Sequence, residues 1–353
     1  MKAKIIGVVV LLVTIIGATV YYFYGKTTDV TEINGYLGGE KIGIMEDEEI
    51  QKIFKKKYHV SFNYSRAGSL DMVTADQKGK DYLFPSSKTA LEFYKEEKGN
   101  PISDDIIFNT PIVLYSHKAV AEALMKDGTV SQKDGVYYAD MKKITDKLTS
   151  DTTWADIGLS ELYGKFCIDT TDPAKSNSGN MFAALLATML CDGNPSDETK
   201  LNEALPKLKT VFENLGYMEN SSSDLFNQFI RTGMGAKPIV VGYENQIIEY
   251  AAENPDKYKN ISDDIVMIYP TPTVWSSHIY IALDDVGKKG VKALCDEDVQ
   301  KLAWEKHGFR TGDFEKSDNE NKESVSGVAK DVNSVINMPD VKTMKKIISE
   351  LED

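Results

Sequence analysis

The sequence predicts an α/β protein with largely parallel sheets, and three observations lead to this prediction. Short runs rich in β-branched and aromatic residues alternate with helical patterns of about ten residues or more, which is typical of parallel α/β folds. Several of these runs end in small polar residues that also begin the next helix. The chain has 353 residues, 42% of them hydrophobic, which is enough for a large core in one two-lobed unit or in two domains.

The expected elements follow from apolar patterning along the chain. Residues 59–65 alternate apolar and polar side chains, as a half-buried strand does. The expected strands are 40–45, 59–65, 80–87, 108–116, 166–168, 237–245, 264–272 and 276–283. The expected helices are 47–58, 88–99, 117–125, a helix opened by 176–180, 246–254 and 341–352, the last docking back onto the fold. Residues 312–327 are polar and are expected to form a loop.

Four polar corners follow expected strands and begin helices. They are "SRAGS" (65–69), "PSS" (85–87), "SNSGN" (176–180) and "GYENQ" (242–246). In open α/β sheets, ligands collect beyond the carboxyl ends of the strands, where unpaired N–H groups and the helix dipole favour a negative group. Arg66, beside the first corner, could pair with an oxyanion through two hydrogen bonds. Each corner taken alone also fits an ordinary helix cap that needs no ligand.

Charge and motifs exclude several classes of function. The chain carries 41 Lys and Arg against 54 Asp and Glu, and no basic run marks a nucleic-acid site. It contains no G-x-S-x-G, Walker-type or dinucleotide-binding motif, so we expect no enzyme and no cofactor. A serine hydrolase using His278 or His117 as base remains an alternative. The four histidines are scattered, so no metal site is expected.

The N-terminus predicts a membrane segment. Residues 5–24 carry no charge and are about long enough to span a bilayer, and Lys2 and Lys4 precede them. The positive-inside rule then places the N-terminus in the cytoplasm and everything after Lys26 outside. We therefore expect residues 1–28 to form a cytoplasmic stub and a signal-anchor; a cleaved signal peptide ending near Ala18 is the alternative. Cys167, Cys191 and Cys295 fit either buried thiols or one disulfide with one free thiol.

The order of elements from Lys41 to Phe314 resembles the type 2 periplasmic binding proteins, the extracellular solute-binding proteins of bacterial importers. Residues 169–185 are similar to the D-P-x-x-S-x-S-G corner of the phosphate, molybdate and tungstate branches. Residues 299–310 are similar to a late helix ending in G-F-R, and residues 107–120 to the strand that crosses between lobes. The resemblance implies a ligand cleft formed by Ser69, Ser86, Ser87, Ser178, Gly179, Asn180 and Tyr243, with Arg66 added from its position beside the first corner.

The resemblance also implies an architecture and a role. Lobe one would comprise residues 35–112 and 274–353, and lobe two residues 113–273, with the cleft between them. The implied function is a membrane-anchored, monomeric ectodomain outside a bacterial cell that binds a small, anionic solute for an ABC-type permease or for sensing. Glu244, next to Tyr243, would repel an anion unless it points away, so a polar or zwitterionic ligand stays open. A surface adhesin or assembly scaffold on the same fold is the alternative function.

Overall fold

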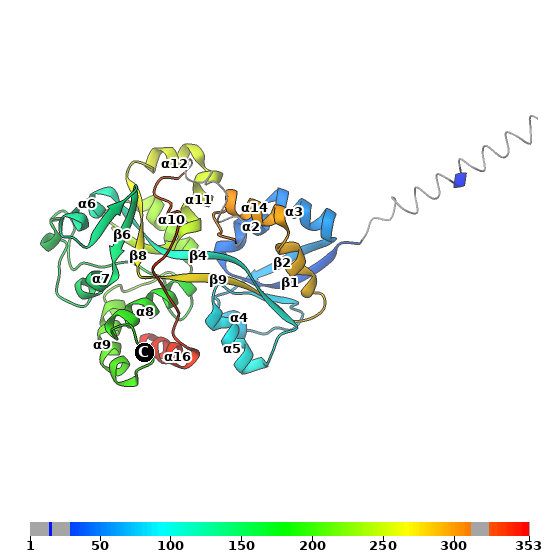
Figure 1. Ribbon diagram of the computed structural model, residues 1–353, viewed down its shortest axis with the longest axis horizontal. Helices are drawn as coiled ribbons and strands as arrows, with labels where there is room; N and C mark the ends of the chain where they lie inside the picture. Colours follow the sequence, from blue (N-terminus) through cyan, green and yellow to red (C-terminus); the bar gives the residue numbers. More distant parts are fainter. Residues whose placement is uncertain (1–13, 16–28, 312–324, 353) are drawn as a thin grey trace, which may run out of the picture.

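The computed structural model describes residues 14–15, 29–311 and 325–352. They form two α/β lobes that lie side by side along the long axis of the molecule (Figure 1). The strands are β1 (Thr31–Leu37), β2 (Val60–Arg66), β3 (Tyr82–Phe84), β4 (Ser103–His117), β5 (Val130–Lys133), β6 (Val136–Asp140), β7 (Ile239–Tyr243), β8 (Ile265–Thr271), β9 (Thr273–Ala282) and β10 (Val335–Ile336).

Helices cover the faces of the sheet in both lobes. Those up to α8 are η1 (Gly39–Lys41), α2 (Ile42–Glu46), α3 (Glu48–Ile53), η2 (Phe54–Tyr58), α4 (Asp71–Thr74), α5 (Lys88–Lys98), α6 (Lys118–Lys126), α7 (Met141–Leu148), η3 (Ala155–Ile157) and α8 (Asn177–Leu190). The later ones are α9 (Glu198–Glu213), α10 (Ser222–Thr232), α11 (Glu244–Glu253), α12 (Pro255–Ile261), α13 (Lys288–Leu294), α14 (Glu297–Glu305) and α16 (Val341–Glu352).

One sheet runs through both lobes in the order β2-β1-β3-β9-β4-β8-β6-β5, with β7 also on β4 and β10 on β9. Strand β4 pairs with β9 over residues 103–111 and with β7 and β8 over residues 112–117, so it belongs to both lobes. Strands β1, β2 and β3 are mutually parallel, as are β6 and β8, whereas β9 is antiparallel to β3 and β4. The sheet is therefore mixed, and β4 and β9 link its two halves.

The core of each lobe lies on both faces of the sheet because neighbouring side chains of a strand point to opposite faces. In lobe one, Tyr82 and Phe84 belong to one buried cluster and Leu83 to another. In lobe two, Ile112 and Leu114 pack under α8 and α9, whereas Val113 and Tyr115 pack under α10 and α11. A sheet covered on both faces needs nearly continuous apolar strands, which is the pattern read from the sequence.

Two expected strands differ from the structure. Residues 40–45, expected as a strand, form η1 and α2, and the first strand lies earlier, at Thr31–Leu37. There Ile33 and Leu37 alternate into the core, and Gly38 and Gly39 end the strand. Residues 166–168 form no strand; Asp169 alone bridges to Val240 of β7. The pairing is limited to Asp169 N–H to Ile239 O (2.9 Å) and Val241 N–H to Asp169 O (2.8 Å).

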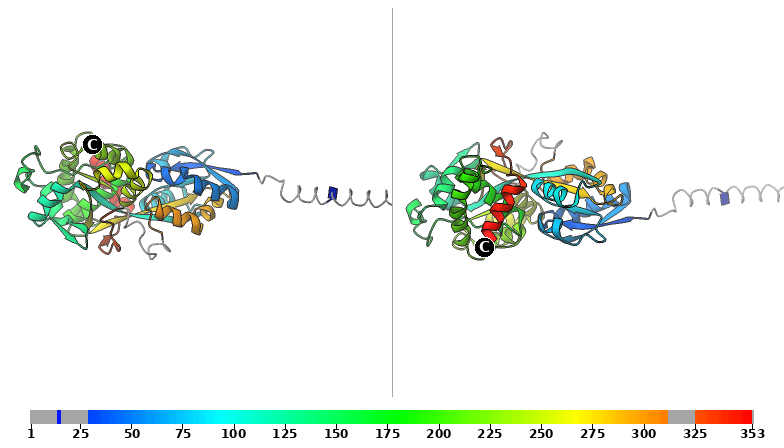
Figure 2. Two further views of the ribbon diagram at one scale, coloured as in Figure 1. Left: turned by 90° about the horizontal axis from the view of Figure 1, so that it is seen from above. Right: turned by 90° about the horizontal axis from the view of Figure 1, so that it is seen from below.

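The expected C-terminal helix is present as α16, but it packs mainly on α8 and α9 of lobe two, whereas we assigned it to lobe one, whose α5 it also contacts. Met344 and Ile347 are buried in the cluster that includes α8 and α9, and residues 325–332 pack under α10 and α11. Strand β9, α13 and α14, which precede residues 312–324, pack in lobe one. The apolar stripe of α16 thus covers lobe two, and Figure 2 shows the helix on that side of the junction.

The predicted membrane segment, residues 5–24, lies outside the described residues apart from Thr14 and Ile15. Across the part of the chain that the structure describes, no helix combines the length and apolar character needed to cross a bilayer. All three cysteines are free thiols, of which Cys191 is buried and Cys295 is exposed.

Candidate functional site

A cavity of about 300 Å³ lies between the lobes at the carboxyl ends of β1, β2 and β7. Lobe one contributes the loop after β1 and the loop after β2; lobe two contributes the starts of α8 and α10 and the end of β7. Its lining residues are Gly38, Gly39, Glu40, Arg66, Ala67, Gly68, Ser69, Asp71, Lys175, Ser176, Asn177, Asn220, Ser221, Ser222, Asp224 and Tyr243. We call this cavity the interlobe cleft.

Two helices begin at the interlobe cleft. The backbone N–H groups of Asn177 and Ser178, the first two residues of α8, have no acceptor among the described residues. The same holds for the N–H of Ser222, the first residue of α10. Unpaired N–H groups at a helix start carry partial positive charge, which the helix dipole reinforces. The lobe-two wall therefore favours a negatively charged group.

The "SNSGN" corner is divided between the cleft and the preceding loop. Ser176 and Asn177 line the cleft. Ser178 instead hydrogen-bonds the Thr171 hydroxyl (2.7 Å), which also accepts the Gly179 N–H (2.8 Å). Thr171 thus satisfies only the Gly179 N–H of this helix start, and the side chain of Ser176, the residue before α8, makes no capping bond.

Gly179 and Asn180 also contact that loop. A Cβ on Gly179 would lie 2.1 Å from the Thr171 carbonyl oxygen, so the backbone of its own loop is what requires glycine there. The side-chain amide of Asn180 lies 3.5 Å from the Pro173 carbonyl oxygen. We expected ligand contacts from Ser178, Gly179 and Asn180, but none of the three lines the cleft.

The predicted lobe-one residues lie in three different places. Arg66 reaches across the cleft and donates to Ser221 Oγ (2.5 Å) and Asp224 Oδ2 (3.0 Å) on α10. Ser69 lines the cleft, and its hydroxyl accepts the Ser86 N–H (2.9 Å), which fixes one loop to the next. Ser87 lines a separate groove of about 700 Å³ with Asn109 and Trp275. Of the predicted residues, Arg66, Ser69 and Tyr243 line the interlobe cleft.

A buried polar cluster lies behind the lobe-one wall. Lys41 Nζ lies 2.5 Å from Glu40 Oε1, 2.6 Å from Ser86 Oγ and 3.2 Å from His278 Nδ1. The Ser86 hydroxyl also contacts Glu40 Oε1. Ser276 Oγ donates to the Ser86 carbonyl oxygen (2.8 Å) and lies 3.4 Å from His278 Nε2. We call Glu40, Lys41, Ser86, Ser276 and His278 the floor cluster.

The charges in the floor cluster compensate one another. Burial raises the pKa of Glu40, but the Lys41 ammonium and hydrogen bonds from Lys41 and Ser86 outweigh it and bring this pKa to about 2. Burial and the Lys41 charge lower the pKa of His278 well below its ordinary value, so this ring is neutral at pH 7. A neutral imidazole thus sits beside one ion pair.

The two histidines of the hydrolase alternative occupy different surroundings. His278 and Ser276 are both completely buried in the floor cluster. His117 lies on lobe two, where Nδ1 contacts Asp264 (2.7 Å). In this structure neither histidine lines the interlobe cleft, so neither lies there beside a serine hydroxyl that it could activate.

Asn177 links the two lobes across the cleft. Its side-chain amide donates to the Ser86 carbonyl oxygen of lobe one (2.8 Å) and to the Tyr243 hydroxyl of lobe two (3.1 Å). Asn177 and Arg66 therefore join the two lobes by side-chain hydrogen bonds, one from each side of the cleft.

The carboxylate of Glu244 points away from the cleft. Arg310 holds it through two hydrogen bonds, Nε to Oε2 (2.6 Å) and Nη2 to Oε1 (2.7 Å), and both side chains are buried. Arg310 also donates to the carbonyl oxygen of Ala329 (2.6 Å), so it fixes the segment that leads to α16. The repulsion that Glu244 would exert on an anion is thereby removed.

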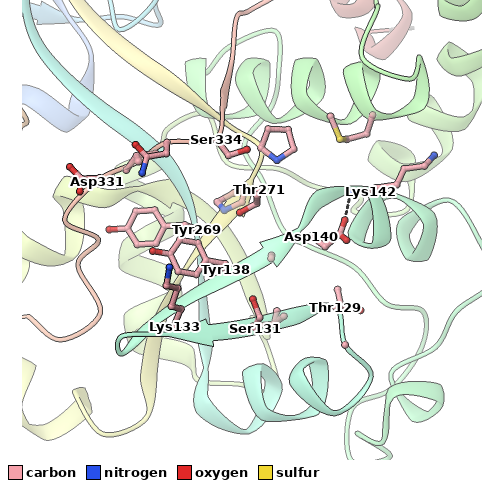
Figure 3. A pocket seen from close by; sticks show the side chains of 18 residues that line it. Thr129, Ser131, Lys133, Tyr138, Asp140, Lys142, Tyr269, Thr271, Asp331 and Ser334 are labelled. Carbon is pink, nitrogen blue, oxygen red and sulfur yellow. Dashed lines mark hydrogen bonds between the residues drawn. The ribbon is translucent and has the colours of Figure 1, made fainter.

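A larger groove, of about 690 Å³, lies on lobe two alone (Figure 3). Tyr138, Lys133 and Ser131 of the β5–β6 hairpin border it on one side, and Asp331 and Ser334 on the other. It contains none of the residues that the sequence singled out. In the described residues, no three His, Cys, Asp or Glu side chains are grouped as metal ligands.

Sequence reasoning missed several cleft residues, above all Glu40, Asn177, Ser221 and Ser222, and Lys41 behind them. Glu40 and Lys41 were assigned to the start of an expected strand, and this assignment hid the "GGEK" turn that follows β1. Ser221 is the residue before α10 and Ser222 is its first residue, in "NSSSDLF", and this further polar corner was the available signal.

No family model matches this chain, and no curated protein matches it in sequence. Solved structures do match its fold. The periplasmic binding protein AfuA from Actinobacillus pleuropneumoniae, with fructose-6-phosphate bound, has a TM-score of 0.57 at 15% identity and covers 92% of this chain and 97% of its own. The substrate-binding protein of an ABC transporter from Agrobacterium tumefaciens has a TM-score of 0.53 at 12% identity over 93% and 96%. The sulfate-binding protein SubI from Mycobacterium tuberculosis has a TM-score of 0.50 at 16% identity over 80% and 88%.

The fold therefore defines the class: this is the two-lobed α/β fold of periplasmic and extracellular solute-binding proteins. The resemblance seen in the sequence implied this two-lobed fold, and the structural comparisons confirm the fold.

Proposed function

We propose that this protein captures a small solute carrying an anionic group, such as a phosphate, sulfate or carboxylate, in the interlobe cleft. The observation that carries the proposal is the wall formed by the starts of α8 and α10, where three N–H groups have no acceptor among the described residues. Preorganised N–H donors at helix starts bind anions without needing net positive charge.

The charges around the cleft cancel, which supports hydrogen-bond donors as the source of ligand specificity. Its lining holds Arg66 and Lys175 against Glu40, Asp71 and Asp224, and Lys41 adds a positive charge behind Glu40. These six charges sum to zero, so long-range attraction is weak and hydrogen bonds select the ligand. Two structures of the same fold carry oxyanion ligands in their names, sulfate and fructose-6-phosphate, which agrees with this choice.

Ligand capture would involve hinge closure about β4 and β9. Arg66 and Asn177 join the lobes across the cleft through three hydrogen bonds, and all three would break when the lobes separate. The ligand stabilises the closed form by adding contacts to both walls. In this proposal the N-terminal segment anchors the protein outside the cell, and a permease of the ABC type or a sensor receives the solute.

The test is a thermal-shift screen of the full chain, followed by calorimetric titration of each hit. The panel contains phosphate, sulfate, molybdate, tungstate, phosphonates, sugar phosphates, organic acids, amino acids and neutral sugars. A ligand at 100 times its Kd should raise the unfolding free energy by about 2.7 kcal/mol. Binding of anionic compounds is expected; binding of neutral sugars alone, or of none of the panel, would overturn the proposal.

A variant tests the place of binding. Asn177→Ala removes the amide that joins Ser86 to Tyr243 across the cleft. We expect weaker binding because the closed form loses the hydrogen bond to Ser86 that joins the lobes, about 1 kcal/mol, whereas the bond to Tyr243 lies within lobe two. Asn333→Ala, in the lobe-two groove, is the control and should leave affinity unchanged.

A further inference from the structure

One carboxylate oxygen in the interlobe cleft lacks a partner. Glu40 lines the cleft and is only 9% exposed. Its Oε1 atom accepts hydrogen bonds from Lys41 Nζ and from the Ser86 hydroxyl, whereas Oε2 has no hydrogen-bond donor among the described residues. Because Oε2 faces the cleft and solvent reaches it there, a ligand gains affinity at this atom when its own hydrogen-bond donor replaces water.

The neighbours of Glu40 decide which donor fits. The Lys41 ammonium, 2.5 Å from Oε1, already compensates the negative charge. A second ammonium, brought by a ligand, would lie close to that of Lys41 and be repelled. A hydroxyl group donates a hydrogen without adding charge, so it matches a carboxylate whose charge is already balanced.

The size of the cleft points to an organic ligand. Its volume is about 300 Å³, the lower end of the range for pockets that hold small organic molecules. One water molecule occupies about 30 Å³, so a bare tetrahedral anion would leave most of the cleft to solvent. Sulfate, moreover, carries no hydrogen and cannot satisfy Glu40 Oε2.

We infer that the solute is a hydroxylated organic anion, in which a hydroxyl donates to Glu40 Oε2 while the anionic group meets the starts of α8 and α10. This inference rests on the proposed function and narrows it to one class, such as a polyol phosphate or a polyhydroxy acid. Lobe one accepts a hydrogen bond from the hydroxyl group, and lobe two donates hydrogen bonds to the anionic group. The ligand must carry both groups to hold the two lobes together.

Matched ligand pairs test the inference by calorimetric titration of the full chain. Glycerol 3-phosphate is compared with propyl phosphate, and gluconate with hexanoate; phosphoethanolamine, inorganic phosphate and sulfate complete the series. We expect the hydroxylated member of at least one pair to bind roughly tenfold to a hundredfold more tightly than its partner and than the inorganic ions, the range for a hydrogen bond to a charged group.

The variant Glu40→Gln should reduce this preference to about threefold or less, because a neutral amide replaces the unpaired carboxylate oxygen. Glu32→Gln, on the exposed side of β1, is the matched control and should keep the full preference. If Glu40→Gln does not fold, the ligand pairs on the unaltered protein still decide the question.

The outcomes separate the inference from the proposed function. Equal affinity within both pairs, inorganic phosphate as tight as the hydroxylated compounds, or phosphoethanolamine tightest would each overturn the inference and leave anion binding in place. No binding by any anion would overturn both.

Discussion

Replacing Gly179 with alanine should destabilise the fold, although a glycine-to-alanine change inside a helix normally increases the free energy of unfolding by up to about 1 kcal/mol. Here the new Cβ would lie 2.1 Å from the Thr171 carbonyl oxygen and 3.0 Å from the Pro173 nitrogen. Ordinary contact begins near 3.4 Å, so backbone must move by more than 1 Å. That loop is fixed by hydrogen bonds from Asp172 N–H to Glu219 O (2.9 Å) and from Ser176 N–H to Asp172 O (2.9 Å).

The magnitude follows from these contacts. Overpacking of a tight site costs about 1 to 3 kcal/mol. Moving the loop also weakens the bond from Gly179 N–H to the Thr171 hydroxyl, at about 1 kcal/mol. After subtracting the helix propensity gained, we expect a loss of about 1 to 3 kcal/mol in the free energy of unfolding, or roughly 2 to 6 °C in Tm.

The assay is chemical denaturation and thermal melting of the ligand-free protein, with titration of any verified ligand alongside. Gly235→Ala is the matched control, because a Cβ at Gly235 has nothing within 4 Å and should leave stability nearly unchanged. Gly179→Ala protein that unfolds like the unaltered protein while its affinity falls would refute this reasoning. It would instead place Gly179 against the ligand.

Three further predictions concern buried polar groups. Thr171→Val should lower the free energy of unfolding by about 1 to 3 kcal/mol in urea titrations, because it leaves the Gly179 N–H without its acceptor. Glu244→Gln should cost about 3 kcal/mol or more by the same measurement, because it leaves the buried charge of Arg310 uncompensated. The pKa of Glu40 is lowered from 4.5 to about 2 in the folded state, so its ionisation stabilises the fold above pH 4.5. About 3 kcal/mol of this stability should disappear between pH 4.5 and 2, and pH-dependent unfolding of Glu40→Gln should lack that loss.

Controls for these variants come from exposed groups of the same kind. Lys142→Met breaks an exposed ion pair with Asp146 (3.5 Å) and should cost less than about 1 kcal/mol. A cost for Glu244→Gln equal to that of Lys142→Met would show that the buried pair with Arg310 does not hold the fold. A pH profile of Glu40→Gln identical to that of the unaltered protein would contradict the role of Glu40.

The fold could be predicted because its strands and helices are long and strongly patterned. Residues 108–116, 264–272 and 276–283 read as strands because apolar runs bordered by turns can bury both faces of a sheet. Residues 341–352 read as a helix because their apolar side chains recur at helical spacing. Elements with one short run were assigned wrongly, as at 40–45, where an apolar pattern of a few residues fits a helix as well as a strand.

Of the four predicted corners, 65–69, 176–180 and 242–246 contribute residues to the interlobe cleft, whereas 85–87 does not line it and the loop after β1 was not predicted. The loops after β1, β2 and β7 and the start of α8 meet at the interlobe cleft, because the carboxyl ends of neighbouring strands share an edge. Which side chain of a corner faces the cleft depends on the helix turn, and this orientation separates Asn177 from Ser178. Successive side chains along a helix differ in direction by about 100°, so one can face the cleft while the next faces the preceding loop.

The sequence by itself determined the α/β class, the polar corners and the position of the long strand β4, because periodicity and turn residues are local properties of the chain. Tertiary structure alone decided that α16 covers lobe two, that Arg310 neutralises Glu244, and that Lys41 joins Ser86 and His278. These contacts join residues up to 237 positions apart. Their energies depend on burial and on the distance between charges, which only the folded chain sets.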